Sequence, residues 1–200
     1  MTIAFISHKD CELHDTGAGH PESPARMRAV LDYLPTRPVW NRLTQHEASL
    51  AATEQLYRVH DKAYVDAVIA AEPTQGRVYL DPDTSMAPHS LNAALRAAGS
   101  VVKGVDLVMS GAAGKAFCCV RPCGHHAEIH RAMGFCMFNK VAVGARYSQD
   151  SYGLKKVAIV DFDVHHGNGT EDIFRSDASV FFASTFQYPF YPGSGADTRS

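Results

Sequence analysis

The stretch from residue 157 to residue 172 constrains the fold more than any other part of this sequence. It opens with a short apolar run, 157–160, that is rich in β-branched side chains. Such a run between polar segments is typical of a buried parallel strand. Directly after it the composition changes to Asp161, Asp163 and His165. Because ligands in open α/β sheets bind beyond the carboxyl ends of the strands, the change predicts a polar site there.

The spacing of these three residues suggests a metal site. Asp161, Asp163 and His165 alternate with apolar residues, and alternate residues of an extended chain point to one face. Burying them together is costly unless a cation compensates their charge. Asp163 and His165 suit a catalytic Zn²⁺ or Fe²⁺, which leaves Asp161 to orient another imidazole or to bind a harder ion. A strand end with a capping aspartate and a surface histidine is the simpler alternative.

A second histidine cluster lies earlier in the chain. His125 and His126 follow another apolar run, 116–120, and Gly134-Phe135-Cys136 comes shortly after them. Two predicted strand ends therefore each carry a histidine pair next to glycines. We expect the two clusters to form one site.

Together the two segments resemble the histone deacetylase family, which includes bacterial deacetylase-like amidohydrolases and acetylpolyamine amidohydrolases. The resemblance is carried by three motifs: His125-His126-Ala127, Gly134-Phe135-Cys136 and Asp161-x-Asp163-x-His165-His166-Gly167-x-Gly169. The asparagine at 168 is closer to the class II branch. The resemblance implies an α/β, three-layer parallel-sheet fold of the arginase/deacetylase type. It covers nearly all 200 residues but only about two thirds of a typical family domain.

The resemblance also implies an activity and the residues that carry it. The activity is zinc-dependent removal of acetyl or other acyl groups from lysine side chains or polyamines by a metal-activated water. Asp163 and His165 would be metal ligands, with Fe²⁺ as the alternative to Zn²⁺. General base and acid catalysis would come from His125 and His126, because imidazole titrates near neutrality. Their partners would be Asp161 for His125 and Asn168 for His126.

Substrate binding follows from the same resemblance. Phe135, after Gly134, and Tyr191 would form the walls of a narrow channel for an extended acyl-lysine or acetylpolyamine chain. Tyr191 stands where the family usually has Phe. Asp83 would sit at the rim and accept hydrogen bonds from the substrate, or it would simply cap a helix. The less favoured alternative is that both rings are core aromatics. A K⁺ site is implied near Asp161, Asp163, His165 and Ser184.

Two family features are absent from the 200 residues: a second metal-binding aspartate and the tyrosine that stabilises the oxyanion. The site would hold two protein ligands, one short of the usual three. Later family strands lie between earlier ones, so we expect a gap in the sheet with uncovered apolar edges. We interpret residues 1–200 as one deacetylase-like catalytic domain, truncated because its carboxy-terminal part is missing. One alternative is an inactive acyl-lysine-binding module. A less favoured one is an arginase-like metallohydrolase, whose two-metal site would require further Asp-x-His-x-Asp ligands.

The composition limits the partners. The chain has 19 basic and 21 acidic residues, and the absence of a basic patch argues against direct nucleic-acid binding. No segment is typical of a signal peptide or a membrane span. The five cysteines are therefore expected to be reduced in the cytoplasm. Cys123 and Cys136 flank the predicted site, where they would be structural, redox-sensitive or stray metal ligands. The oligomeric state is left open.

Apolar periodicity outlines the other elements. Alternating strands and helices indicate a parallel sheet with right-handed crossovers. Arg26, in the first predicted helix, is either solvated or near an internal channel, and His60 is interpreted as structural. The expected elements are a strand at 3–6, a helix after Ser23-Pro24, an extended segment at 39–48, a helix from Ser49 to Leu56, a helix after Asp61, a loop at 76–84, helices at 90–109 and 138–147, a helix at 169–174 and a strand at 180–184.

Overall fold

A computed structural model describes residues 2–196 of the chain. The strands are β1 (Ile3–Ser7), β2 (Leu43–Glu47), β3 (Val78–Asp81), β4 (Thr84–Met86), β5 (Lys115–Cys118), β6 (Val157–Asp161) and β7 (Val180–Ser184). The α-helices are α1 (Pro24–Tyr33), α2 (Thr53–Tyr57), α3 (Lys62–Ala70), α4 (Ser90–Met109), α5 (Lys140–Tyr152) and α6 (Asn168–Phe174). Short 3₁₀ turns occupy Lys9–Glu12, Leu34–Thr36 and Pro38–Arg42.

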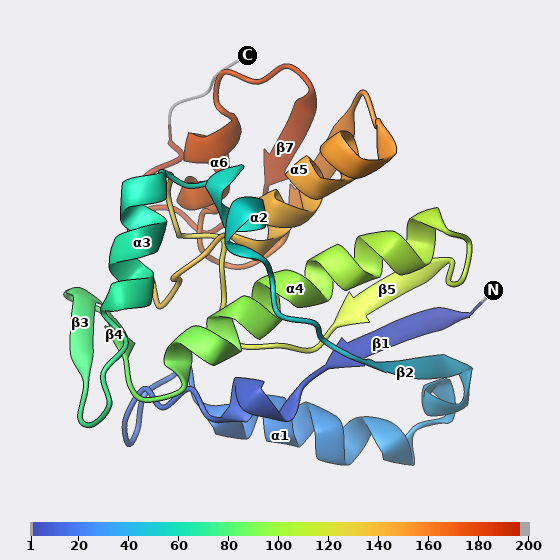
Figure 1. The fold of residues 1–200 in the computed structure, drawn as a ribbon, viewed down its shortest axis with the longest axis horizontal. Helices are drawn as coiled ribbons and strands as arrows, with labels where there is room; N and C mark the ends of the chain where they lie inside the picture. Colours follow the sequence, from blue (N-terminus) through green and yellow to red (C-terminus); the bar gives the residue numbers. More distant parts are fainter. Residues whose placement is uncertain (1, 197–200) are drawn as a thin grey trace.

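The first sheet is parallel and lies between two helices. Its strand order is β2-β1-β5, with α1 below it and α4 above it in Figure 1. The alternation of a strand explains the two contacts: Ala4 and Ile6 pack on the α4 side with Leu107, whereas Phe5 packs with Met27 of α1. This arrangement gives the three layers, helix on sheet on helix, that the sequence predicts.

Helix α4 is the central support of the fold. It crosses the middle of the molecule in Figure 1 and packs against both α5 and β5. Small residues let the backbone of a neighbouring segment come close: a Cβ atom at Gly99 would lie 2.0 Å from the carbonyl oxygen of Ser49. The largest apolar core lies on this side of the molecule and includes Leu56, Val65 and Val143.

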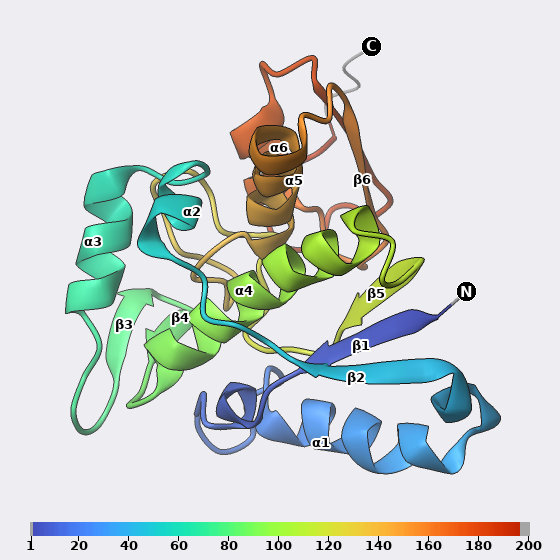
Figure 2. The ribbon, with the colours of Figure 1, turned by 45° about the vertical axis from the view of Figure 1, so that its right-hand side comes forward.

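The second sheet is a separate parallel pair, β6-β7. Figure 2 shows β6 standing apart from the β2-β1-β5 sheet. Within residues 2–196, the outer edges of β5 and β6 have no strand partner. Phe117 of β5 is 51% exposed and Val160 of β6 is 64% exposed. The expected gap with uncovered apolar edges is therefore present. The prediction of a parallel strand at 157–160 is confirmed, but its predicted burial was wrong, because β6 pairs along one edge only and just Ile159 is buried.

Several boundaries differ from the sequence prediction. Helix α2 begins at Thr53 instead of near Ser49, because 49–51 is the extended segment that packs against Gly99. The antiparallel hairpin β3-β4 begins inside the predicted loop at 76–84 and ends just beyond it, at Met86. Its strands are too short to give a clear alternation. Helix α5 begins later than residue 138, since Asn139 caps it by accepting a hydrogen bond from the Ala142 N–H. The prediction for 90–109 matches α4.

His60 holds the loop that carries the histidine pair. Its Nδ1 donates to the Glu128 carbonyl over 2.8 Å, and its Nε2 accepts the Asn139 N–H over 2.9 Å. Burial lowers the pKa of His60 from 6.5 to about 4. The imidazole is therefore neutral in the folded protein at neutral pH, and protonating Nε2 would remove the bond from Asn139. These contacts agree with the interpretation of His60 as structural.

We expect His60 to make the fold sensitive to acid. Above pH 6.5 the ring is neutral in both states, so its stabilisation is complete there. Between pH 6.5 and about 4 the unfolded chain binds the proton first, and the free energy of unfolding should fall by up to about 3 kcal/mol. Urea unfolding across this range should show a shallower pH dependence for His60→Gln than for wild type. The exposed His130→Gln is the control, and an unchanged slope in His60→Gln would contradict the assignment.

Candidate active site

The two predicted clusters follow the carboxyl ends of β5 and β6. His125 and His126 lie on the long segment after β5, and Asp163 and His165 lie just after β6. The chain beyond Asp161 turns instead of staying extended: the Asp163 N–H donates to Asp161 Oδ1 (3.1 Å) and the His165 N–H donates to Asp163 Oδ1 (2.8 Å). The extended backbone that was predicted from Asp161 to His165 is therefore wrong.

The structure nevertheless brings the two clusters together. His125 Nε2 lies 3.9 Å from Asp163 Oδ1. The rings of His126 and His165 have centroids 6.0 Å apart, and those of His125 and His126 are 4.0 Å apart. Both pairs are thus within reach of one small ligand.

Each histidine of the pair has a partner that fixes its tautomer. His125 Nδ1 lies 2.8 Å from Asp161 Oδ2, and a carboxylate can only accept, so Nδ1 carries the proton. His126 Nδ1 lies 2.7 Å from Asn168 Oδ1, while the Asn168 amide nitrogen donates to Glu128 over 2.8 Å. The amide oxygen therefore faces His126. Both rings keep Nε2 free for chemistry.

The electrostatics differ between the two histidines. Burial, reinforced by the charge of His125, lowers the pKa of His126 from 6.5 to about 4. Burial by itself would raise the pKa of Asp161, but the hydrogen bond and charge of His125 outweigh it and hold that pKa below its usual value. His126 is therefore neutral beside a neutral amide, whereas His125 faces an ionised carboxylate.

A pocket of about 620 Å³ opens above these groups. Phe135 lies on its wall, and the ring of Tyr191 stands edge-on to His126 with centroids 5.0 Å apart. Both rings line the pocket, so they are not core aromatics. The complete lining is Pro21, Glu22, Arg26, Asp83, Cys123, His125, His126, Gly134, Phe135, Asp163, His165 and Tyr191.

The turn that carries Phe135 is strained and braced. Gly134 has φ 58° and Phe135 has φ 67°, a backbone region that side chains rarely adopt. The Gly134 N–H donates to Asp83 Oδ1 (2.9 Å) and the Phe135 N–H donates to Thr84 Oγ1 (3.0 Å). Asp83 reaches the pocket rim as predicted and caps no helix. Thr84 gave no sequence signal, because its role depends on the unpredicted β3-β4 hairpin.

His166 lies away from the pocket. Its Nδ1 is 2.9 Å from Ser194 Oγ, and its Nε2 is 3.2 Å from Glu171. These contacts join the start of α6 to the loop that carries Tyr191. The second histidine of the His165-His166 motif is thus part of the scaffold.

Asp163 and His165 could hold a metal ion from one side. The Asp163 side chain is half exposed and the His165 side chain somewhat less. Asp163 Oδ1 lies 3.1 Å from His165 Nδ1. A carboxylate with an imidazole is a donor set that Zn²⁺ accepts. Among residues 2–196 there is no cluster of three or more His, Cys, Asp or Glu side chains arranged to bind a metal. Metal binding by Asp163 and His165 stays a prediction. Ser184 belongs to the predicted K⁺ site, and its Oγ lies 3.5 Å from the Gly167 backbone nitrogen. The K⁺ site also stays a prediction.

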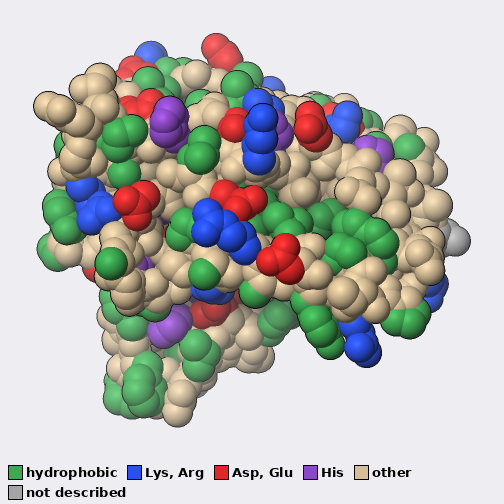
Figure 3. All heavy atoms as spheres, turned by 90° about the horizontal axis from the view of Figure 1, so that it is seen from below, with side chains coloured by type: hydrophobic (Ala, Val, Ile, Leu, Met, Phe, Trp, Pro, Cys, Tyr) green, Lys and Arg blue, Asp and Glu red, His purple; other side chains and the backbone are tan. Residues whose placement is uncertain are grey.

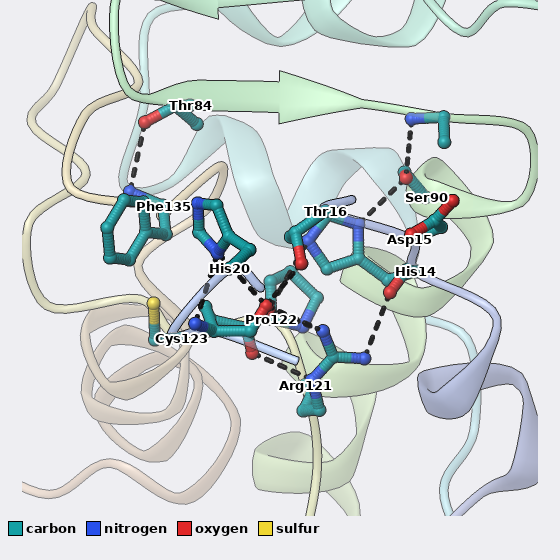
Figure 4. A network of polar contacts seen from close by, with 12 residues as sticks. His14, Asp15, Thr16, His20, Thr84, Ser90, Arg121, Pro122, Cys123 and Phe135 are labelled. Atoms are coloured by element: carbon teal, nitrogen blue, oxygen red, sulfur yellow. Dashed lines mark hydrogen bonds and ion pairs between the residues drawn. The ribbon is translucent and has the colours of Figure 1, made fainter. Parts of the chain in front are cut away.

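A buried ion pair at the pocket wall was not predicted from the sequence. Arg121 and Glu22 are both almost fully buried, and the guanidinium also donates to the carbonyls of Cys11 and His14. Figure 4 shows Arg121 with His14, Thr16 and Ser90 in one polar network. The only signal in the sequence was an arginine at the start of the Arg121-Pro122-Cys123-Gly124 segment that precedes the histidine pair. Arg26, which was expected to be either solvated or near an internal channel, lines the pocket.

The surface shows no sign of a charged binding face on the side seen in Figure 3. Basic and acidic side chains are interspersed there, as the near balance of charge suggests. In residues 2–196 no helix has both the length and the apolar character needed to cross a membrane.

A solved structure of a known protein identifies the fold class. The chain superimposes on a crystal structure of the HDA15 HD domain with a TM-score of 0.92 and 38% sequence identity, over 98% of this chain and 56% of that one. The fold is therefore the parallel-sheet deacetylase fold. The histone deacetylase domain family matches residues 20–200, and the chain belongs to this family.

Two of the curated relatives with deacetylase names are a rat protein and an archaeal protein. The chain is 36% identical to the polyamine deacetylase HDAC10 of Rattus norvegicus, over 99% of this chain and 36% of that protein. It is 32% identical to a probable deacetylase of Archaeoglobus fulgidus, over 98% of this chain and 54% of that protein. The chain thus spans about a third to about half of the length of these relatives.

Proposed function

We propose that this chain carries the histidine side of the active site of a zinc-dependent deacetylase that acts on acylated lysine side chains or acylated polyamines. The observation that carries the proposal is the placement of His125 and His126. Each ring is fixed through Nδ1 to its own partner, and both face the Asp163–His165 pair in a pocket walled by two aromatic rings. The deacetylase names of the relatives support the same activity.

The residues of the chain would divide the proton chemistry between them. Asp163 and His165, together with a third donor, would hold a Zn²⁺ ion. When bound, this ion would polarise the substrate carbonyl. His126 is neutral and presents Nε2 to the pocket, so it can accept the proton of the attacking water. His125, held by the Asp161 carboxylate, can carry positive charge and return a proton to the leaving amine. Phe135 and Tyr191 would hold the alkyl chain between them.

The test measures zinc binding and hydrolysis together. The protein would be loaded with Zn²⁺ and assayed with a fluorogenic acetyl-lysine amide. We expect bound zinc, turnover, and competition by N-acetylspermidine if polyamines share the pocket. Asp163→Ala should lose zinc affinity and turnover together.

Other outcomes identify the alternatives. Acetyl-lysine binding without zinc or turnover would favour an inactive acyl-lysine-binding module, which the two-ligand donor set also allows. Release of urea from arginine would favour an arginase-like enzyme. Location in the cytoplasm stays a prediction.

A further inference from the structure

Two cysteine sulfurs meet in the wall of the pocket. Cys136 Sγ lies 3.2 Å from Cys123 Sγ and donates to it. Cys123 lines the pocket, whereas Cys136 is fully buried behind it. All five cysteines are free thiols, and Cys11, Cys118 and Cys119 lie elsewhere, around β1, β5 and α4.

Both sulfurs contact the turn that shapes the pocket. Cys123 Sγ is 3.6 Å and Cys136 Sγ is 3.3 Å from the carbonyl oxygen of Gly134. That glycine packs directly on the catalytic ring, since a Cβ there would lie 2.3 Å from His126 Cδ2. The thiol pair, the strained turn and His126 therefore form one continuous contact chain. Figure 4 shows Cys123 beside Pro122 in the same close-up as Phe135.

We propose that Cys123 and Cys136 are a redox modification site, at which hydrogen peroxide converts the two thiols into a disulfide that closes down the pocket. The loss of activity, though not the disulfide itself, rests on the proposed deacetylase function. Neither cysteine is needed as a ligand or as a base in the mechanism above, so the pair is free for this role.

The oxidation occurs in two balanced steps. The Cys123 thiolate attacks one oxygen of the peroxide, an S–O bond forms, the O–O bond breaks, and hydroxide leaves. Cys136 then gives up its proton and attacks the sulfur of the resulting sulfenic acid, an S–S bond forms, and the S–O bond breaks with release of water. In total, two thiols and one peroxide give one disulfide and two waters.

The two thiols are suited to different steps. Cys123 lines the pocket. The hydrogen bond donated by Cys136 lowers the pKa of the Cys123 thiol against the opposing effect of burial, and the charges of Lys140 and His125 act in the same direction as that hydrogen bond. Burial raises the pKa of Cys136 and keeps it protonated. The accessible thiol with more thiolate character reacts first, and the buried one resolves it.

The bond would disturb the pocket because the sulfurs must move. A disulfide joins sulfurs about 2 Å apart, so the pair must approach by about 1 Å. Their shared contacts with the Gly134 carbonyl would be lost or shifted, and the turn would move against His126. A displacement of this size near a reacting group can cost about 10²-fold in rate.

Peptide mass spectrometry tests the disulfide without reference to activity. After peroxide treatment and alkylation of the remaining thiols, trypsin should give a cross-linked pair made of residues 116–131 and 132–140. Because 116–131 also holds Cys118 and Cys119, fragmentation must locate the bond at Cys123. The cross-link should persist in Cys118→Ser and disappear in Cys123→Ser. Its absence in wild type, or a bond to Cys118 or Cys119, would overturn the proposal.

The rate test compares each protein with its own untreated sample. In the zinc-loaded enzyme, peroxide should reduce turnover of the acetyl-lysine amide by about 10²-fold, and dithiothreitol should restore it. Cys118→Ser should respond as wild type does, and Cys123→Ser, or Cys123→Ala if the serine variant does not fold, should be insensitive. A cross-linked enzyme with full turnover would overturn the inhibitory role. If the reduced protein has no turnover while the cross-link forms, the proposed function fails and the modification site stands.

Discussion

His126→Ala is expected to reduce turnover by about 10³-fold in the zinc-loaded protein while leaving zinc affinity near that of wild type. The loss is that of a general base, which contributes about 10²- to 10⁴-fold in comparable enzymes. Zinc affinity should persist because the rings of His126 and His165 have centroids 6.0 Å apart, and the alanine leaves Asp163 and His165 in place. Steady-state hydrolysis and zinc titration of the same preparation check both parts.

The control for this variant is the exposed His130→Ala, which should change neither quantity. Asn168→Ala is a second comparison. It keeps the His126 ring but removes the oxygen that its Nδ1 contacts, so it should lower the rate less than His126→Ala does. Turnover that survives in His126→Ala would refute the assignment of the base.

Gly134→Ala is expected to reduce turnover by about 10²-fold through displacement of His126. The new Cβ would lie 2.3 to 2.8 Å from three atoms of that side chain, so the ring, whose Nδ1 contacts Asn168, would have to move. Alanine is also disfavoured at φ 58°, which adds about 1 kcal/mol of backbone strain. Turnover and thermal unfolding of the variant measure the two effects separately.

Gly153→Ala isolates the strain from the contact. Gly153 ends α5 at φ 69°, and a Cβ atom at this position would have no heavy atom within 4 Å. The variant should lose stability to a similar extent as Gly134→Ala while keeping its rate. If both variants lose turnover equally, the contact with His126 is not the cause.

The sequence was most informative where one physical pattern acts alone. The period of α4 and the apolar runs of β5, β6 and β7 predicted these elements within a few residues. It was least informative where a segment is shaped by a distant neighbour. The 49–51 segment is extended because it lies against Gly99, and the β3-β4 hairpin is held by bonds to Gly134 and Phe135.

The candidate site shows the same division. Residue types and spacings pointed to the histidine pair, whereas its partners and the two walls were expected only from the family resemblance. The structure brings these side chains together. The buried residues that pair behind the pocket lining could not be predicted from the sequence. Glu22 and Arg121 pair across 99 positions, and nothing in either local sequence specifies the other. The roles of the site residues stay predictions until the variants above are measured.

The brace from Asp83 and Thr84 to the Gly134–Phe135 turn has a kinetic consequence. Because two backbone N–H groups of the turn are already bound to the hairpin, that wall of the pocket is in place before any ligand arrives. An entering alkyl chain then loses its own rotational freedom but need not order the turn. Association should accordingly be a single step whose observed rate rises linearly with ligand concentration, without the plateau of a slow closing motion.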